Sequence, residues 1–167
     1  MNEASKLKLI ALDTGPLGLV THPRPVPESE AAQCLERVLE WVAAGVRVLV
    51  PAVADYELRR EYLLRNAEAS LKRLDELPEL LDYVPISDTA LRRAAVLWAR
   101  TRQAGRPTAD PKALDADCII ASQVRLEAEA LGLSEDEWII ATVDVGDLSS
   151  LAPAARWREI EILQADA

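Results

Sequence analysis

The chain alternates between short apolar runs and longer stretches in which apolar residues recur every three or four positions. A short apolar run between turn-forming residues predicts a buried strand, and the longer spacing predicts an amphipathic helix. The expected strands are residues 6–13, 46–53, 83–87, 137–144 and 157–163, of which the last alternates like an edge strand. The expected helices are residues 27–45, 54–77, 88–105 and 115–131.

Prolines mark several boundaries in this pattern. Pro51 is expected to close the second strand, and Pro78 interrupts the helical pattern of residues 54–77, which can form two pieces. The polar residues 106–113 predict a loop. Strands separated by helices predict an α/β fold with a central, mainly parallel sheet. With 167 residues, the whole chain (1–167) is expected to form a single domain.

Composition narrows the classes of protein. No apolar run is long enough for a membrane span, and the first residues lack the pattern of a signal peptide. Two isolated cysteines, Cys34 and Cys118, match neither a disulfide framework nor a zinc site, so we expect a cytoplasmic protein without a membrane partner. The net charge of −9 argues against a broad electrostatic grip on nucleic acid, although it permits a local basic patch.

The segment LDADCIIAS (residues 114–122) places two aspartates at the start of an apolar helical run. In a helix, Asp117 shares the apolar face with Ile120 and Val124. A carboxylate on that face needs a charged partner, hydrogen bonds or a metal ion, because burial of an unpaired charge is costly. Asp115 points the other way, which favours a role as the helix N-cap.

Three further acids occupy positions beyond strands. Asp13 follows the first strand, Asp144 follows the strand over residues 137–144, and Glu57 lies in the first turn of the helix after the second strand. Each can be explained alone as a cap or turn residue. Ligands of a parallel sheet gather at the carboxyl ends of its strands, so these acids and Asp117 are expected at one edge. Clustered carboxylates repel one another and call for a cation.

The residue types indicate which cation this is. The single histidine, His22, lies far from the acids in the sequence, and carboxylates with Thr14 and Thr142 beside them suit Mg²⁺ or Mn²⁺ rather than zinc. One or two such ions can activate a water molecule for phosphodiester hydrolysis, without a side-chain nucleophile.

The motifs LIALDTGPL, VPAVADYEL, LDADCIIAS and ATVDVGDL follow one another in an order that resembles the PIN-domain ribonucleases. Among them, the chain is similar to the VapC-like toxins of type II toxin–antitoxin modules. The resemblance implies a three-layer α/β/α fold and a metal-dependent endoribonuclease that hydrolyses RNA through a metal-activated water. It also implies a cognate antitoxin as partner and a homodimer. The catalytic and metal-binding residues carried over by motif are Asp13, Glu57, Asp117 and Asp144, and the supporting positions are Thr14, Thr142 and Asp147.

Three features depart from the family pattern. Leu148 follows Asp147 where an aromatic residue is common, and the helical region 54–105 is longer than in the most compact members. Asp115 is an additional acid, which either supports the metal ligands or caps its helix.

Rival functions explain parts of the same sequence. The triplet Asp13-Thr14-Gly15 also occurs in aspartic proteases, but those enzymes are β-rich and would leave Asp117 without a role. A stand-alone RNA-processing nuclease would use the same chemistry as a toxin. A non-catalytic PIN-like RNA-binding or scaffold module is expected to have lost acids, and all four are present.

Arginines follow Glu57 along its helix and recur in the next helix. A solvated helix face with ion pairs explains them, and an RNA track beside the acids is the alternative. The candidates for RNA contact are Arg59, Arg60, Arg100 and Arg102. Trp98 is expected in the core, although it could stack on a base. Apolar positions of the helices over 27–45 and 54–77, among them Leu63 and Leu64, either support a homodimer or serve the core.

Overall fold

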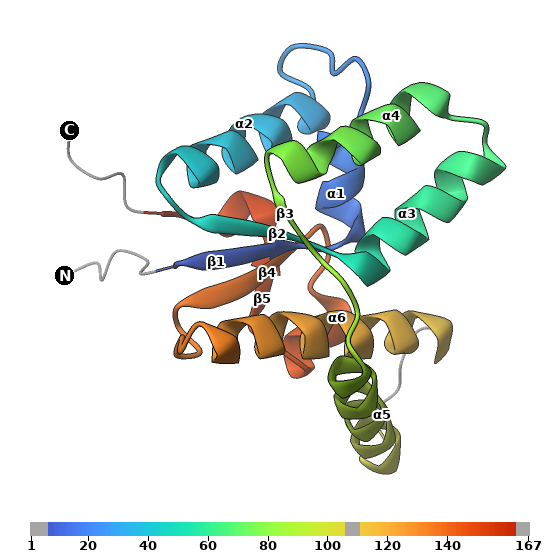
Figure 1. Ribbon diagram of the computed structural model, residues 1–167, viewed down its shortest axis with the longest axis vertical. Helices are drawn as coiled ribbons and strands as arrows, with labels where there is room; N and C mark the ends of the chain where they lie inside the picture. Colours follow the sequence, from blue (N-terminus) through green and yellow to red (C-terminus); the bar gives the residue numbers. More distant parts are fainter. Residues whose placement is uncertain (1–6, 106–110, 163–167) are drawn as a thin grey trace.

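The computed structural model describes residues 7–105 and 111–162, without the side chains of 111–113, and is organised around one sheet (Figure 1). Every strand pairing given for the described residues is parallel. Across the sheet, the order is β3 (Asp82–Val84), β2 (Arg47–Pro51), β1 (Leu9–Leu12), β4 (Trp138–Thr142) and β5 (Ala154–Arg156). The predicted α/β fold with a parallel sheet is confirmed.

The helices form two layers around the sheet. In chain order they are α1 (Thr14–Val20), α2 (Glu30–Ala43), α3 (Ala52–Leu64), α4 (Glu68–Glu76), α5 (Asp88–Gln103) and α6 (Pro111–Ala130), with short 3₁₀ turns η1 (Leu77–Glu79), η2 (Gly146–Ser150) and η3 (Trp157–Glu159). Figure 1 shows α1 and α2 on one face and α6 on the other, with α5 outside α6. This three-layer α/β/α arrangement excludes the β-rich aspartic-protease fold. Within the described residues, no helix has the length and apolar character needed to span a membrane.

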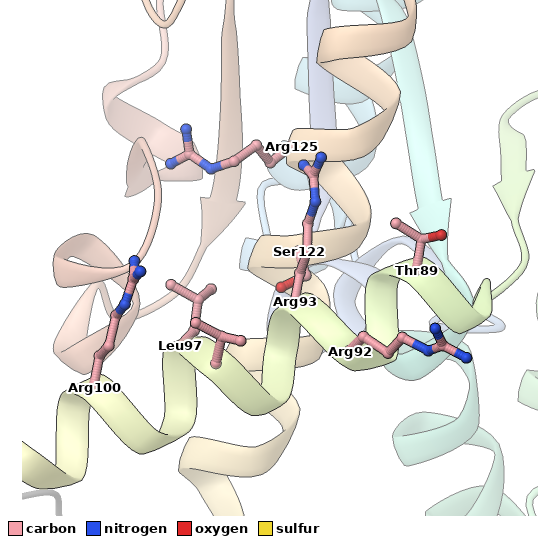
Figure 2. A pocket seen from close by; sticks show the side chains of 8 residues that line it. Thr89, Arg92, Arg93, Leu97, Arg100, Ser122 and Arg125 are labelled. Carbon is pink, nitrogen blue, oxygen red and sulfur yellow. The ribbon is translucent and has the colours of Figure 1, made fainter.

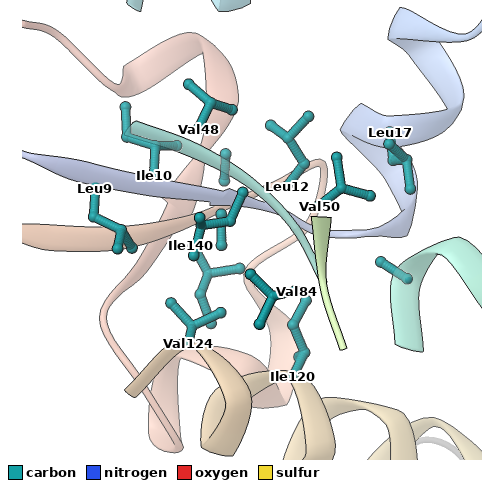
Figure 3. Close-up of a cluster of buried hydrophobic side chains, with 14 of the residues drawn as sticks. Leu9, Ile10, Leu12, Leu17, Val48, Val50, Val84, Ile120, Val124 and Ile140 are labelled. Carbon is teal, nitrogen blue, oxygen red and sulfur yellow. The ribbon is translucent and has the colours of Figure 1, made fainter. Parts of the chain in front are cut away.

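The core lies on both faces of β1. All four residues of this strand are fully buried. Leu17 of α1 packs from one side and Ile120 and Val124 of α6 pack from the other (Figure 3). Because a central parallel strand is covered twice, it reads as a continuous apolar run rather than an alternating one.

Helix α1 is absent from the sequence-based prediction. Its residues, TGPLGLV, include two glycines and a proline, so intrinsic helix propensity is low. The helix forms because Asp13 caps its first turn and because Leu17 and Val20 are buried against the core. Tertiary packing overrides local preference here.

The predicted edge strand over residues 157–163 is wrong for residues 157–162, and residue 163 lies outside the described residues. The fifth strand is β5, whose Ala154–Arg156 pairs with Ile140–Thr142, and the chain then turns into η3. Trp157 and Ile160 are both buried at a spacing of three residues. The alternation in WREIEIL therefore resembles that of a strand, although its buried apolar residues lie in and directly after a 3₁₀ turn that packs against the core.

Two helix starts are defined more closely by the structure. Helix α5 is capped by the Ser87 side chain, which accepts a hydrogen bond from the Ala90 N–H. Helix α6 begins at Pro111, so residues 111–113 belong to a helix and not to the predicted loop; residues 106–110 of that loop lie outside the described residues.

The division of residues 54–77 into two helices is confirmed. Between α3 and α4, Asn66 adopts a φ of 53°, a left-handed conformation that asparagine tolerates better than most residues. Pro78 lies in η1, where the helical pattern stops as predicted.

Candidate active site

Asp13 stands at the carboxyl end of β1 and is held by both carboxylate oxygens. Its Oδ1 accepts a hydrogen bond from the Thr14 N–H at 2.8 Å, which caps α1. Its Oδ2 accepts one from the Thr142 hydroxyl at 2.8 Å. Thr142 is the last residue of β4, the neighbour of β1 in the sheet. The Asp13 side chain is thereby fixed at the edge where these two strands end.

Glu57 reaches the same edge from α3. The Thr14 hydroxyl donates to Glu57 Oε1 at 3.0 Å, so Thr14 contacts both acids, Asp13 through its N–H and Glu57 through its hydroxyl. The other oxygen, Oε2, lies 3.8 Å from an Arg60 nitrogen in a partly exposed ion pair. The predicted meeting of Asp13 with Glu57 is therefore mediated by Thr14.

Asp117 lies in α6, on the opposite face of the sheet from α1, and faces these acids. Burial, followed by the negative charges of Asp13, Glu57 and Asp147 in that order, raises the pKa of Asp117 to about 7. Those contributions place three other carboxylates close enough to Asp117 to disfavour its negative charge. The inward-facing carboxylate of LDADCIIAS thus lies among other acids rather than beside a basic partner.

The two acids after β4 occupy different positions. The Asp144 carboxylate accepts a hydrogen bond from a backbone N–H two residues on, at 3.2 Å. Its backbone carbonyl lies 3.0 Å from the Thr142 hydroxyl, which also donates to Asp13. Asp147, in η2, is the one whose charge acts on Asp117. The sequence analysis assigned Asp147 only a supporting role. Its position on a turn that packs against α6 becomes apparent only from the fold.

Asp115 is not the N-cap of its helix, because α6 begins four residues earlier at Pro111. Its side chain is exposed and, with Trp98 and Cys118, lines a cavity of about 370 Å³ between α5 and α6. The charge of Asp115 contributes to raising the pKa of the Cys118 thiol to about 11, after burial and Asp117. Asp115 therefore faces α5.

The donor set is made of carboxylate and hydroxyl oxygens, which Mg²⁺ and Mn²⁺ prefer. Within residues 7–105 and 111–162, no group of three or more His, Cys, Asp or Glu side chains is arranged to hold a metal ion directly. Mg²⁺ usually keeps several water molecules and binds one or two carboxylates. The acids therefore fit an ion that is held partly through water.

The arginines of α3 are engaged by acids of their own. Arg59 forms two hydrogen bonds to Asp55, at 2.9 and 3.1 Å, and one to Asp75 at 2.7 Å. These bonds hold the Arg59 pKa above its ordinary value. Arg60 lies over the Tyr56 ring, 5.4 Å from its centre. Arg59 thus ties α3 to α4.

The two candidate arginines of α5 lie on a different part of the molecule (Figure 1). Arg102 lies over the Trp98 ring at 5.4 Å from its centre, and Arg100 lines a separate pocket between α5 and α6. Trp98 is 37% exposed, so the expectation of a core tryptophan is wrong. The four candidate RNA contacts do not form one track.

Comparison with known proteins identifies the fold. No protein-family model matches the sequence, and no curated protein matches it. Among solved structures, VapBC2 from Rickettsia felis bound to a DNA fragment from its promoter has a TM-score of 0.63 at 16% identity, covering 89% of this chain and 98% of that one. VapBC-1 from nontypeable Haemophilus influenzae has a TM-score of 0.60 at 16% identity, covering 90% and 99%. FitAcB from Neisseria gonorrhoeae has a TM-score of 0.57 at 22% identity, with the same coverage.

The chain has the fold of a VapC-like PIN domain. The sequence resemblance is confirmed at this level, because the likeness spans nearly the whole of each chain. In this PIN-like fold Asp13, Glu57 and Asp117 gather at one sheet edge with Asp147, whereas Asp144 is linked to them only through Thr142.

Gly15 leaves no room for a side chain beside this edge. A Cβ atom there would lie 2.7 and 2.8 Å from the two methyl carbons of Val143, which separates Thr142 from Asp144. We predict that Gly15→Ala lowers the free energy of unfolding by about 1–3 kcal/mol, as overpacking typically does. Val143→Ala should restore most of the loss, as measured in a double-mutant cycle by urea unfolding.

Gly18→Ala is the matched control in the same helix. Its Cβ would meet only Leu58 Cδ1 at 3.5 Å, an ordinary contact. The packing argument would be contradicted if Gly18→Ala lowered the free energy of unfolding as much as Gly15→Ala does. It would also be contradicted if Val143→Ala did not restore the stability lost in Gly15→Ala.

The raised pKa of Asp117 predicts a specific pH dependence. Because the folded state binds this proton more tightly than the unfolded state, the charged carboxyl destabilises the fold progressively as pH rises from about 4 to about 7. Asp117→Asn should equal the wild type in stability near pH 4 and exceed it above pH 7. Urea unfolding across this range, in EDTA, measures the difference.

Asp115→Asn is the control, because this carboxyl is exposed on the same helix. The Asp115→Asn variant should have the same free energy of unfolding as the wild type at every pH. If Asp117→Asn were less stable by the same amount throughout, Asp117 would be a structural carboxylate held by hydrogen bonds.

Proposed function

We propose that this chain is a Mg²⁺- or Mn²⁺-dependent endoribonuclease and the toxin of a toxin–antitoxin pair. The observation that carries the proposal is the gathering of Asp13, Glu57, Asp117 and Asp147 at one edge of a parallel sheet, with Asp144 joined through Thr142. Strand ends of a parallel sheet are where ligands bind in such folds. A chain with no cationic ligand for this edge would gain nothing from crowding four charges there.

The residues present account for binding and orientation. A bound Mg²⁺ or Mn²⁺ would lower the pKa of a water molecule and offset charge on the phosphate. Thr14 and Thr142 fix Glu57 and Asp13 by one hydrogen bond each, and every carboxylate oxygen retains a further lone pair. Because its pKa is raised to about 7, Asp117 is partly protonated near neutral pH, and a cation competes with that proton for the carboxylate.

RNA as the polymer comes from the resemblance of the four motifs to PIN-domain ribonucleases. An antitoxin partner follows from the likeness to VapC, and the solved structures that share this fold carry the name VapBC. A stand-alone RNA-processing nuclease would share the site. A short reading frame overlapping this one and encoding a DNA-binding protein would favour the toxin over that alternative.

Cleavage assays on tRNA and mRNA pools test the proposal. The wild type should cleave with Mn²⁺ or Mg²⁺ and lose activity in EDTA. Asp117→Asn should reduce the rate by at least about a hundredfold, because it removes a charge that would hold the cation, and Asp115→Asn should not. Asp117→Asn should also reduce the rise in melting temperature that Mn²⁺ produces. Equal cleavage with and without EDTA would rule out the metal mechanism.

We propose in addition that the protein forms a homodimer through the outer surface of α3. Leu63 and Leu64 are 60% and 77% exposed near the end of that helix, whereas Val38 of α2 and Leu74 of α4 are buried in the core. Leu64→Asp should shift the sedimentation coefficient from dimer to monomer at micromolar concentration, while Leu80→Asp, a change at another exposed leucine, should not. A monomeric wild type would refute this proposal.

A further inference from the structure

A pocket of about 630 Å³ opens between α5 and α6, away from the carboxylates (Figure 2). Val96 and Leu97 of α5 give it an aliphatic part, and Thr89 and Ser122 line it as well. Arginine side chains stand around it: Arg93 and Arg100 rise from α5, and Arg125 extends from α6. In a chain of net charge −9, such a concentration of arginine on one surface calls for an explanation.

The three arginines differ in how firmly they are held, and Arg125, which also lies over the Trp138 ring at 5.3 Å from its centre, is the most constrained. Arg93 pairs with Glu129 at 2.7 Å and Arg125 with Glu135 at 2.6 Å, and the two glutamates are 50% and 73% exposed. Exposed ion pairs of this kind contribute little to stability, so a competing anion can replace the glutamates. Arg100 makes no ion pair with any described residue.

The pocket and the carboxylates are bordered by the same elements. Arg125 follows Asp117 by eight residues on α6, a rise of about 12 Å along the helix. Its Nη2 donates to the Leu151 carbonyl at 3.5 Å, directly after η2, which carries Asp147. A polymer bound across α6 can therefore contact both the arginine-lined pocket and the carboxylates.

We propose that this arginine-lined pocket binds the phosphate backbone of single-stranded RNA next to the scissile bond. The choice of RNA rests on the proposed function. The carboxylate edge repels a polyanion, so affinity for RNA has to come from cationic groups elsewhere on its path. Arginine binds phosphate bidentately, and none of the described residues that line the pocket is aromatic, so it offers no platform for stacking a base. Recognition of the backbone rather than the sequence follows.

Removing the competing glutamate provides a gain-of-binding test. In an Asp117→Asn background, where labelled single-stranded RNA stays intact, Glu129→Gln frees Arg93 and should tighten binding about two- to fivefold. Arg100→Ala should weaken binding about three- to tenfold, the loss of one charge-assisted contact, and lower the salt dependence of log K by about 1. Fluorescence anisotropy across a salt series measures both.

Glu61→Gln is the matched control for charge. Glu61 pairs with Arg65 at 3.4 Å on α3, so the substitution changes net charge equally without touching the pocket. Thermal melts verify that each variant is folded, and Arg100→Lys replaces Arg100→Ala if the latter is not. Equal effects of Glu129→Gln and Glu61→Gln, or no effect of Arg100 substitution, would overturn the inference.

The outcomes separate this inference from the proposed function. If the variants change RNA affinity as expected but the wild type does not cleave RNA, the proposed nuclease is refuted and the proposed RNA site is not. If the wild type cleaves RNA but the variants do not change RNA affinity, only the proposed RNA site is refuted. Competition by poly-glutamate as strong as that by unlabelled RNA would show that the pocket recognises acidic chains in general, which also overturns the assignment.

Discussion

Parallel pairing of β1 with β2 on one side and β4 on the other places three strand ends at one edge of the sheet. The registers Ile10↔Val48 and Ile10↔Ile139 set the strands side by side, so the residues after each strand emerge together. Hydrogen bonds from Thr14 and Thr142 then fix Asp13 and Glu57 across those ends. Everything proposed about chemistry depends on this alignment, because a slip in register would move a strand's buried side chains to the wrong face.

The sequence predicted the features that depend on strong patterns. Continuous apolar runs identified β1, β2 and β4, and the apolar face of α6 identified Asp117 as an inward-facing carboxylate. Features set by tertiary context were missed or mistaken. Helix α1 has weak propensity, residues 157–163 imitate a strand, and Trp98 is exposed because α5 lies outside the layer that covers the sheet. The nearness of Asp147 to Asp117 depends on how η2 packs on α6, which no local pattern encodes.

The arginines of α3 and those of α5 differ in how fully they are paired with acids. On α3, Arg59 is engaged by Asp55 and Asp75 and serves to join two helices. On α5, Arg93 and Arg100 face a hollow whose only described counter-charges sit on exposed side chains of α6 and its following turn. Similar arginine spacing in two helices thus has a structural use in one and leaves the other available for a ligand.

Helix α5 rests on α6 through a narrow seam of small residues, Ala90, Ala94 and Thr101, while Leu91 and Val96 remain exposed. Its buried side chains are small, and it packs on α6 rather than directly on the sheet, so we expect it to open more readily than the strands. Its amide protons should exchange with solvent deuterium through local opening, long before those of β1 exchange through global unfolding. The arginine-lined pocket therefore lies between α6, which packs on the sheet, and a helix that is expected to open before the sheet does, so the width of the pocket can adjust to a bound molecule.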